Sequence, residues 1–223
     1  MRRFITAISR RLFPPTETLE GYAEPELIDV IFLKTKAYSP KEHWPEMAGV
    51  SSVLDFGGGC GLHYKLARRQ SPDIRWAVVE TPAMVKRAGE LATDRLQFFT
   101  DISDAHAWLG AIDVMHSNSV LQYTKDPEDT LRRLCGIRAR RMIWERITLS
   151  KQCIEREVQS SLLGDNGPGS LAGLREKTVR YTRTKIPERA FLDAHNEYVL
   201  TERGEGWFRF SLRERPSAFA RTH

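Results

Sequence analysis

The pattern of apolar and polar residues changes character near residue 50. From there, short apolar runs alternate with stretches in which apolar residues recur every three or four positions. Runs of the first kind predict buried strands, and those of the second kind predict amphipathic helices. The expected strands cover residues 52–57, 74–80, 96–101, a run that starts at 112, and 140–148. The expected helices cover residues 62–70, 81–92 and 126–137, the last two with Thr81 and Asp126 as N-caps.

Strands that alternate with helices predict a parallel sheet covered by helices on both faces. The end of the chain differs, because a short helix at 187–195 precedes two extended runs around Gly204-Glu205-Gly206, a hairpin signal. We therefore expect an α/β fold with a Rossmann-like doubly wound sheet. The sheet should be mostly parallel and seven-stranded, with a C-terminal antiparallel hairpin.

Outside this regular part, the pattern predicts three further regions. Residues 1–49 form an N-terminal helical segment, polar-faced over 17–49, and the core domain covers 50–215 with a tail at 216–223. Residues 151–185, with GDNGPGS in the middle, form an insertion that we expect to be functional or mobile. Within 1–13, apolar residues share a helical face that arginines flank. This helix packs on its own domain or makes a peripheral contact with an anionic membrane.

Composition narrows the choice of partners. The chain has 223 residues and a net charge of +5 with a pI near 9.2, and the basic residues are spread along it. This excess allows an anionic substrate, but we expect no nucleic-acid partner. Cys60, Cys135 and Cys153 form no CxxC pair, so we expect no metal site and a reducing, cytoplasmic location.

The densest chemical signal is the stretch SSVLDFGGGCGLHY, in which four glycines follow an expected strand. A strand that ends in glycines and leads into a helix forms a crevice for a nucleotide-sized ligand. The dinucleotide fingerprint G-x-G-x-x-G fails in every frame, because Leu62, Cys60 and Tyr64 stand where glycine is required. The alternative pattern D-x-G-x-G-x-G is complete, and its carboxylate suits a cationic ligand.

The run Asp55, Gly57, Gly58, Gly59, Gly61 resembles motif I of the class I S-adenosylmethionine-dependent methyltransferases. The resemblance implies that this loop holds the amino-acid and sulfonium part of S-adenosylmethionine. It also implies that Glu80, at the end of the second strand, accepts the ribose hydroxyls, with Thr81 beside it. Asp101 and Ile102, after the third strand, then lie near the adenine, although an aspartate at a strand end is also a common helix cap.

The stretches DFGGGCGLHY, WAVVE, SNSVLQYTKDPEDTL and WERIT are also similar to a narrower, poorly characterised bacterial family of methyltransferases. Many of its members are associated with surface-polysaccharide genes. The likeness covers about residues 50–160 and weakens afterwards, although Val158-Gln159 recurs. It implies cofactor contacts at Ser117 and Asn118. It implies substrate contacts at Tyr64, Gln122, Tyr123 and Gln159.

Methyl transfer to oxygen needs a base if the acceptor must lose a proton. His63 lies just after the glycine loop and is the candidate for this base, although a packing or capping role is the alternative. His116 lies inside an expected strand, and we expect it to be a core residue. We expect Arg146 either to bind an anionic acceptor or to pair with a neighbouring carboxylate. We expect the basic stretch 175–185 to form either a lid over an acidic acceptor or a solvated face.

We therefore expect S-adenosylmethionine-dependent methyl transfer to a small-molecule or glycan acceptor, on oxygen. The alternatives are a catalytically silent cofactor-binding protein and a nicotinamide-dependent oxidoreductase.

Overall fold

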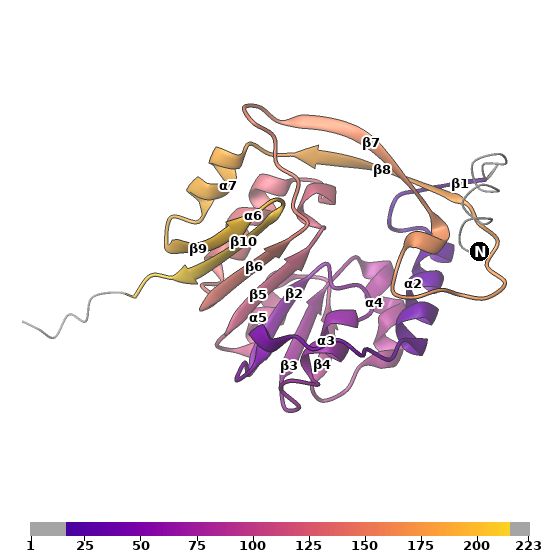
Figure 1. Cartoon of the computed structure of the whole chain (residues 1–223), viewed down its shortest axis with the longest axis horizontal. Helices are drawn as coiled ribbons and strands as arrows, with labels where there is room; N and C mark the ends of the chain where they lie inside the picture. The colour runs from indigo at the N-terminus through magenta and orange to yellow at the C-terminus, as the bar shows by residue number, and fades with distance from the viewer. Residues whose placement is uncertain (1–16, 215–223) are drawn as a thin grey trace, which may run out of the picture.

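The computed structural model describes residues 17–214, and its centre is a seven-stranded sheet in the order β4-β3-β2-β5-β6-β10-β9. The strands are β2 (Ser52–Phe56), β3 (Arg75–Val79), β4 (Leu96–Phe99), β5 (Val114–Asn118), β6 (Arg141–Glu145), β9 (Tyr198–Gly204) and β10 (Trp207–Leu212). The first five are parallel, whereas β10 runs antiparallel to both β6 and β9. The predicted fold class is confirmed, including the C-terminal hairpin (Figure 1).

Helices and short turns connect the strands. They are α3 (Leu62–Ala67), α4 (Pro82–Ala88), η2 (Gly89–Leu91), α5 (Ile102–Leu109), η3 (Leu121–Tyr123), α6 (Pro127–Gly136) and α7 (Glu188–Ala194). The predicted caps are confirmed, because Thr81 accepts a hydrogen bond from the Met84 N–H and Asp126 accepts one from the Asp129 N–H. Helix α5 is a finding that the sequence pattern did not predict.

The sheet is covered on both faces. Leu54, Met115 and Trp144 pack toward α5, α6 and α7 on one face. Trp76 and Ile143 face the opposite side, in the cluster that contains the buried residues of α3. From β2 the chain adds β3 and β4 on one side of the sheet, and it then crosses over to add β5 and β6 on the other side of β2. The crevice at this switch point, between β2 and β5, is where α/β sheets of this type bind their ligands.

The expectation of a polar-faced helical stretch over 17–49 is wrong in two respects. Residues Thr18–Glu20 form a strand, β1, and the helix α2 (Pro25–Ala37) is followed only by a short turn, η1 (Pro45–Met47). Helix α2 also buries four apolar side chains, namely Leu27, Ile28, Val30 and Phe32. Its apolar residues face two neighbours, the loop region around Leu163 and helix α4.

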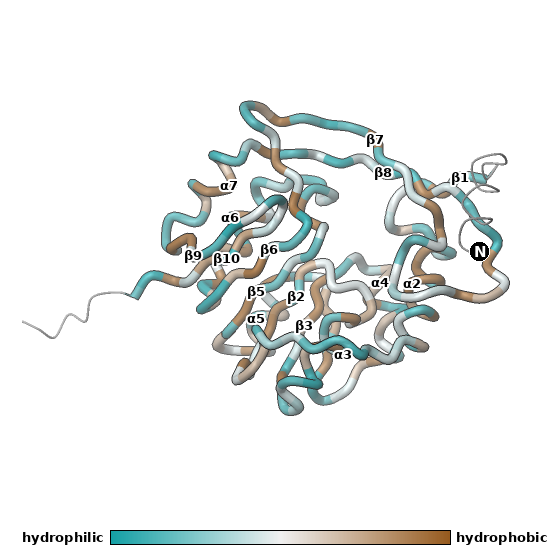
Figure 2. The backbone as a smooth tube through the Cα atoms, viewed as in Figure 1, coloured by the Kyte–Doolittle hydropathy of each residue, from teal (hydrophilic) through white to brown (hydrophobic). Residues whose placement is uncertain are grey.

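The insertion at 151–185 contains two long strands, β7 (Glu155–Leu162) and β8 (Thr178–Lys185), joined through the turn η4 (Leu163–Asp165). They pair antiparallel with each other, and β1 adds to β8 in parallel, which gives a second sheet in the order β1-β8-β7. Figure 1 shows this pair reaching from the α7 side of the large sheet to α2. Figure 2 shows that these strands are more hydrophilic than the central ones.

Two expectations concern regions beyond these elements. The helix expected within 1–13, with its membrane contact, and the tail 216–223 lie outside the described residues. Between residues 17 and 214, no helix has the length and apolar character needed to cross a bilayer.

Candidate active site

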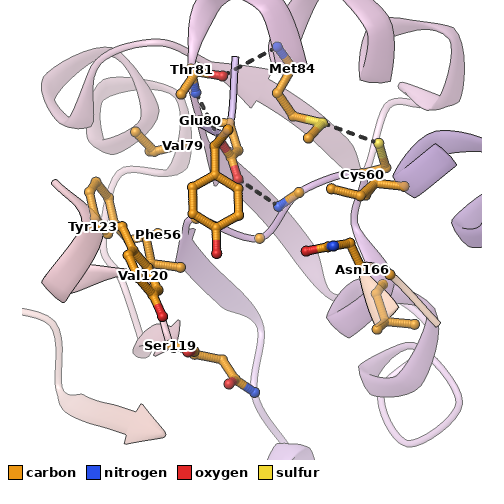
Figure 3. Close-up of a pocket in the computed structure, with 18 of the residues that line it drawn as sticks. Phe56, Cys60, Val79, Glu80, Thr81, Met84, Ser119, Val120, Tyr123 and Asn166 are labelled. Atoms are coloured by element: carbon orange, nitrogen blue, oxygen red, sulfur yellow. Dashed lines mark hydrogen bonds between the residues drawn. The ribbon is translucent and has the colours of Figure 1, made fainter. Parts of the chain in front are cut away.

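A cavity of about 660 Å³ lies at the carboxyl ends of β2, β3 and β5, with residues of the second sheet in its wall. Its volume is in the range of small-molecule sites. Its lining includes the glycine loop, Glu80 and Met84, and also Tyr123, Gln159 and Tyr181. Figure 3 shows the first group with Asn166 facing it across the space.

The glycine loop needs glycine for two reasons. Gly57, Gly59 and Gly61 have φ angles of 75°, 57° and 82°, in the left-handed region that other residues rarely adopt. Gly58 has an ordinary φ, but a Cβ there would lie 2.3 Å from the Asp55 Oδ2 atom. The loop therefore passes directly over the Asp55 carboxylate.

Asp55 does not line the cavity, because it is fully buried beneath that loop. Its Oδ1 accepts a hydrogen bond from His116 Nδ1 at 2.7 Å, and its Oδ2 lies 3.3 Å from His63 Nδ1 and 3.1 Å from Trp76 Nε1. Burial alone would raise the pKa of this carboxyl, but the two histidines outweigh it and hold the pKa below its usual range. The carboxylate therefore anchors the base of the loop and orients His63.

His116 continues this polar network across the sheet. Burial would lower its pKa, but Asp55 and Glu145 outweigh burial and raise the pKa to about 9. Its Nε2 lies 3.8 Å from Glu145 Oε2 and has no hydrogen-bond partner among residues 17–214. The neighbouring His116, opposed by burial and aided by Arg209, lowers the pKa of Glu145 to about 2. His116 is thus a buried cation and not a plain core residue.

Asp55, His63 and His116 also place one potential ligand atom each within 4.8 Å of one another, a spacing that suits a metal ion. The same atoms already satisfy one another, because both Nδ1 atoms point to the Asp55 carboxylate. The geometry is that of a hydrogen-bonded ion cluster.

Glu80 sits on the rim of the cavity at the end of β3. Its Oε1 accepts from the Gly59 N–H at 3.1 Å, and its Oε2 accepts from the Thr81 N–H at 2.9 Å. Burial raises the pKa of Glu80, opposed by these two backbone donors. One carboxylate therefore joins the glycine loop of β2 to the start of α4.

The structure brings most of the predicted site residues together at this cavity. Those that line it are Gly57, Gly58, Gly59, His63, Glu80, Thr81, Asn118, Tyr123, Arg146 and Gln159. Those that do not line it are Asp55, Gly61, Tyr64, Asp101, Ile102, Ser117 and Gln122.

The predicted residues outside the cavity wall have identifiable structural roles. Asp101 caps α5 and pairs with Arg133 at 2.6 Å, so the helix-cap alternative describes its geometry. Ile102 and Tyr64 are buried in the core. Gln122 Nε2 donates to the Arg146 carbonyl at 3.1 Å and so supports a residue that does line the cavity.

Two non-glycine residues at the rim adopt the left-handed conformation, Ser119 with φ of 60° and Arg146 with φ of 48°. They follow the ends of the neighbouring strands β5 and β6, and strained backbone of this kind concentrates at functional sites. Arg146 Nε donates to Asn118 Oδ1 at 2.6 Å. Among residues 17–214, no ion pair forms at Arg146, contrary to the alternative that it pairs with a neighbouring carboxylate.

None of the five cations in the basic stretch 175–185 lines the cavity. Each of them forms an ion pair with a glutamate, at residues 17, 20, 26, 155 or 157. From this stretch Tyr181 reaches the cavity instead. Arg175 and Arg180 are exposed, as the solvated-face alternative expects, whereas Lys177, Arg183 and Lys185 are largely covered.

Sequence reasoning missed several lining residues, namely Tyr22, Ser119, Ser161, Tyr181 and the loop 165–168. Along β7, the residues at 157, 159 and 161 are less exposed than those at 156, 158 and 160. An alternation of exposed and covered residues with a period of two is typical of a strand. All of residues 156–161 except Val158 are polar, so the hydropathy pattern of the sequence does not reveal this strand.

Neither a protein-family model nor a curated protein matches the sequence. Among solved structures, DesVI of Streptomyces venezuelae has a TM-score of 0.51 and 16% identity over 86% of this chain and 92% of its own. The sugar N-methyltransferase KedS8 from Streptoalloteichus sp ATCC 53650 has a TM-score of 0.48 and 17% identity, covering 86% of this chain and 88% of its own. CalS10, an amino pentose methyltransferase from Micromonospora echinaspora, has a TM-score of 0.46 and 16% identity, covering 96% and 98%.

At such low identity these likenesses concern the fold. Together with the strand order, the likeness to DesVI supports a Rossmann-like fold of the kind found in methyltransferases.

Proposed function

We propose that this protein transfers a methyl group from S-adenosylmethionine to an oxygen atom of a small-molecule or glycan acceptor. The observation that carries the proposal is the bridge from the Gly59 N–H to Glu80 at the cavity rim. A carboxylate at the end of the second strand of such a sheet accepts the two ribose hydroxyls of a nucleoside. The open loop beside it suits the amino-acid portion of the cofactor.

The residues divide the cavity into two ends. S-adenosylmethionine, when bound, supplies a methyl group on a strong leaving group, so the protein chiefly aligns the reactants and excludes water. Glu80, Thr81 and the glycine loop would hold the cofactor. The second sheet covers the acceptor end, where Gln159 and Tyr181 keep the acceptor in place and bulk water out.

His63 is our candidate for the base. Its Nδ1–H points to the Asp55 carboxylate, which leaves Nε2 as the atom that accepts a proton. Asn118 Nδ2 lies 3.4 Å from that Nε2 and orients the ring. When the acceptor oxygen takes the methyl group and S-adenosylhomocysteine leaves, Nε2 would accept the proton of that oxygen, and the Asp55 carboxylate would stabilise the imidazolium.

The motifs of the narrower bacterial family support the same proposal. SNSVLQY forms the end of β5 and the turn η3, and it contributes Asn118 and Tyr123 to the cavity. We retain, as part of the proposal, membership of that family and a role in glycan synthesis in the cytoplasm.

Calorimetric titration with S-adenosylmethionine and with its product S-adenosylhomocysteine tests the proposal. We expect both to bind, and Glu80→Ala to weaken binding by roughly 10- to 100-fold, since hydrogen bonds to a charged group are lost. Glu128→Ala, an exposed glutamate of α6, is the matched control and leaves the affinity unchanged.

Binding of a nicotinamide cofactor in place of these two ligands would contradict the proposal. A silent cofactor-binding protein passes the titration but produces no methylated acceptor. His63→Gln separates the two roles, because it abolishes most of the methylation rate and leaves the cofactor affinity intact.

A further inference from the structure

We propose that the acceptor end of the cavity binds a sugar that carries a carboxylate or a phosphate group. We define the acceptor subsite as Tyr22, Tyr123, Gln159, Tyr181 and Arg146, all of which line the cavity. This inference rests on the proposed function and names the chemistry of the acceptor that the function leaves open.

Three tyrosines from separate elements form one aromatic wall of the subsite. Tyr22 follows β1, Tyr123 lies in η3 and Tyr181 lies in β8. Their ring centroids are 4.8 Å apart for Tyr22 and Tyr181, 5.3 Å for Tyr22 and Tyr123, and 5.2 Å for Tyr123 and Tyr181. Rigid aromatic faces beside a few polar groups suit the apolar C–H face of a sugar ring.

Gln159 supplies a fixed amide beside these rings. Its Oε1 accepts a hydrogen bond from Tyr123 Oη at 2.7 Å. This bond orients the amide, so that the N–H groups of Nε2 remain for a ligand hydroxyl. The inner face of β7 thus offers the planar polar group that a sugar hydroxyl requires.

Arg146 supplies the charge. Its backbone is strained, with φ of 48°, and Gln122 holds it through the carbonyl oxygen. Its Nε is bound to Asn118, whereas the contacts found over residues 17–214 leave its two terminal nitrogens for a ligand. A guanidinium fixed through one edge presents the other to a carboxylate or phosphate.

The charges around the cavity agree with an anionic acceptor. Lys125 also lines the cavity and forms no ion pair with the residues from 17 to 214. The carboxylates that line the cavity are Glu80, at the cofactor end, and Asp165, whose charge acts on Lys34. Arg146 also borders a second hollow with Glu46, Glu145, Glu202 and Glu205, and among residues 17–214 it forms no ion pair with any of them.

Ligand-observed NMR on the full chain, saturated with S-adenosylhomocysteine, tests the proposal with millimolar D-glucose, D-glucuronate and D-glucose 1-phosphate. We expect one or both anionic sugars to bind at least tenfold more tightly than glucose. Arg146→Gln should weaken the anionic sugars by roughly 10- to 100-fold and leave the affinity for S-adenosylhomocysteine unchanged. Arg180→Gln is the matched control, because Arg180 is exposed on the outer face of β8 and pairs with Glu20.

The two anionic arms identify whether the group is a carboxylate or a phosphate. Equal binding of all three sugars, or no binding of any of them to the saturated protein, would overturn the proposal. A loss of S-adenosylhomocysteine affinity in Arg146→Gln would also overturn it, because Arg146 then serves the cofactor. Failure of the wild-type protein to bind S-adenosylhomocysteine at all would count against the proposed function itself.

Discussion

Asp55 belongs to the predicted motif, but it lies buried beneath the glycine loop and does not line the cavity. The motif directs attention to its negative charge as a partner for a cationic ligand. In the structure that charge faces His116, His63 and Trp76 beneath the loop. Its effect on a bound ligand is therefore indirect, through the conformation of the loop and the orientation of His63.

Gly58 tests this arrangement at the scale of a single methyl group. In Gly58→Ala, the new Cβ would lie 2.3 Å from Asp55 Oδ2, and the three donors prevent the carboxylate from moving. Overpacking of this kind costs about 1–3 kcal/mol. We expect the free energy of unfolding, measured with urea, to fall by that amount.

Gly89→Ala is the control for that change. No atom lies within 4 Å of a Cβ at Gly89, and its φ of −52° is helical. We expect it to be neutral or slightly stabilising, since alanine restricts the unfolded chain. Equal stability of the two variants would show that the loop can move away from Asp55.

At the scale of elements, β2 to β6 could be predicted because each contains a short apolar run, and β9 and β10 could be predicted from the turn residues between them. β7 and β8 could not, because both of their faces are largely polar and they bury little on their own. β1 has only three residues and is stabilised by β8, which lies more than 150 positions further along. Such pairing leaves no local mark on the sequence.

Lys34 fixes one of these unpredicted regions to α2. Its buried Nζ donates to the carbonyls of Gly164 and Asn166, both at 2.7 Å, and burial lowers its pKa. Gly167 packs against Ile31 of the same helix. Because residues 165–168 line the cavity, this contact sets the shape of the cofactor end.

Lys34→Met should therefore release the loop. We expect faster amide hydrogen exchange over residues 163–168, a loss of about 1–3 kcal/mol in local stability, and weaker binding of S-adenosylhomocysteine. Lys36→Met is the control, because Lys36 is exposed on the same helix. Unchanged exchange in Lys34→Met would mean that the packing of Gly167 alone holds the loop.

At the scale of the whole molecule, the two ends of the cavity differed in how far they could be predicted. The cofactor end comes from a glycine loop and a strand end within 30 residues of each other, so a local motif identifies it. The acceptor end combines Tyr22, Tyr123 and Tyr181 with Arg146, residues that only the tertiary fold brings together. Its charge and aromatic character follow from the structure.

A row of alternating charges also crosses the large sheet from β2 to β10. Asp55 pairs with His116, His116 faces Glu145, and Glu145 Oε1 accepts from Arg209 at 2.9 Å. Arg209 in turn pairs with Glu46 at 2.7 Å. Buried charges are tolerated only when paired, so the fold depends on the ionisation of this row.

The stability of the protein should therefore fall both at alkaline pH and at acid pH. The pKa of His116 is about 9, above its ordinary value, so its contribution is complete below about pH 6.5 and is lost as the pH rises through 9. The pKa of Glu145 is about 2 and that of Asp55 is also depressed, so their contributions are present above about pH 4 and lost as the pH falls. We expect the highest Tm between about pH 4.5 and 6.5.

Thermal unfolding at constant ionic strength checks this profile, and His116→Gln assigns its alkaline side. The variant should be less stable at pH 6 and should show a flatter decline between about pH 6.5 and 9, because the group that loses its proton there is gone. The acid side, which belongs to the carboxylates, should remain. A wild-type Tm that stays constant from pH 6.5 to 9 would show that His116 does not carry a charge in the folded protein.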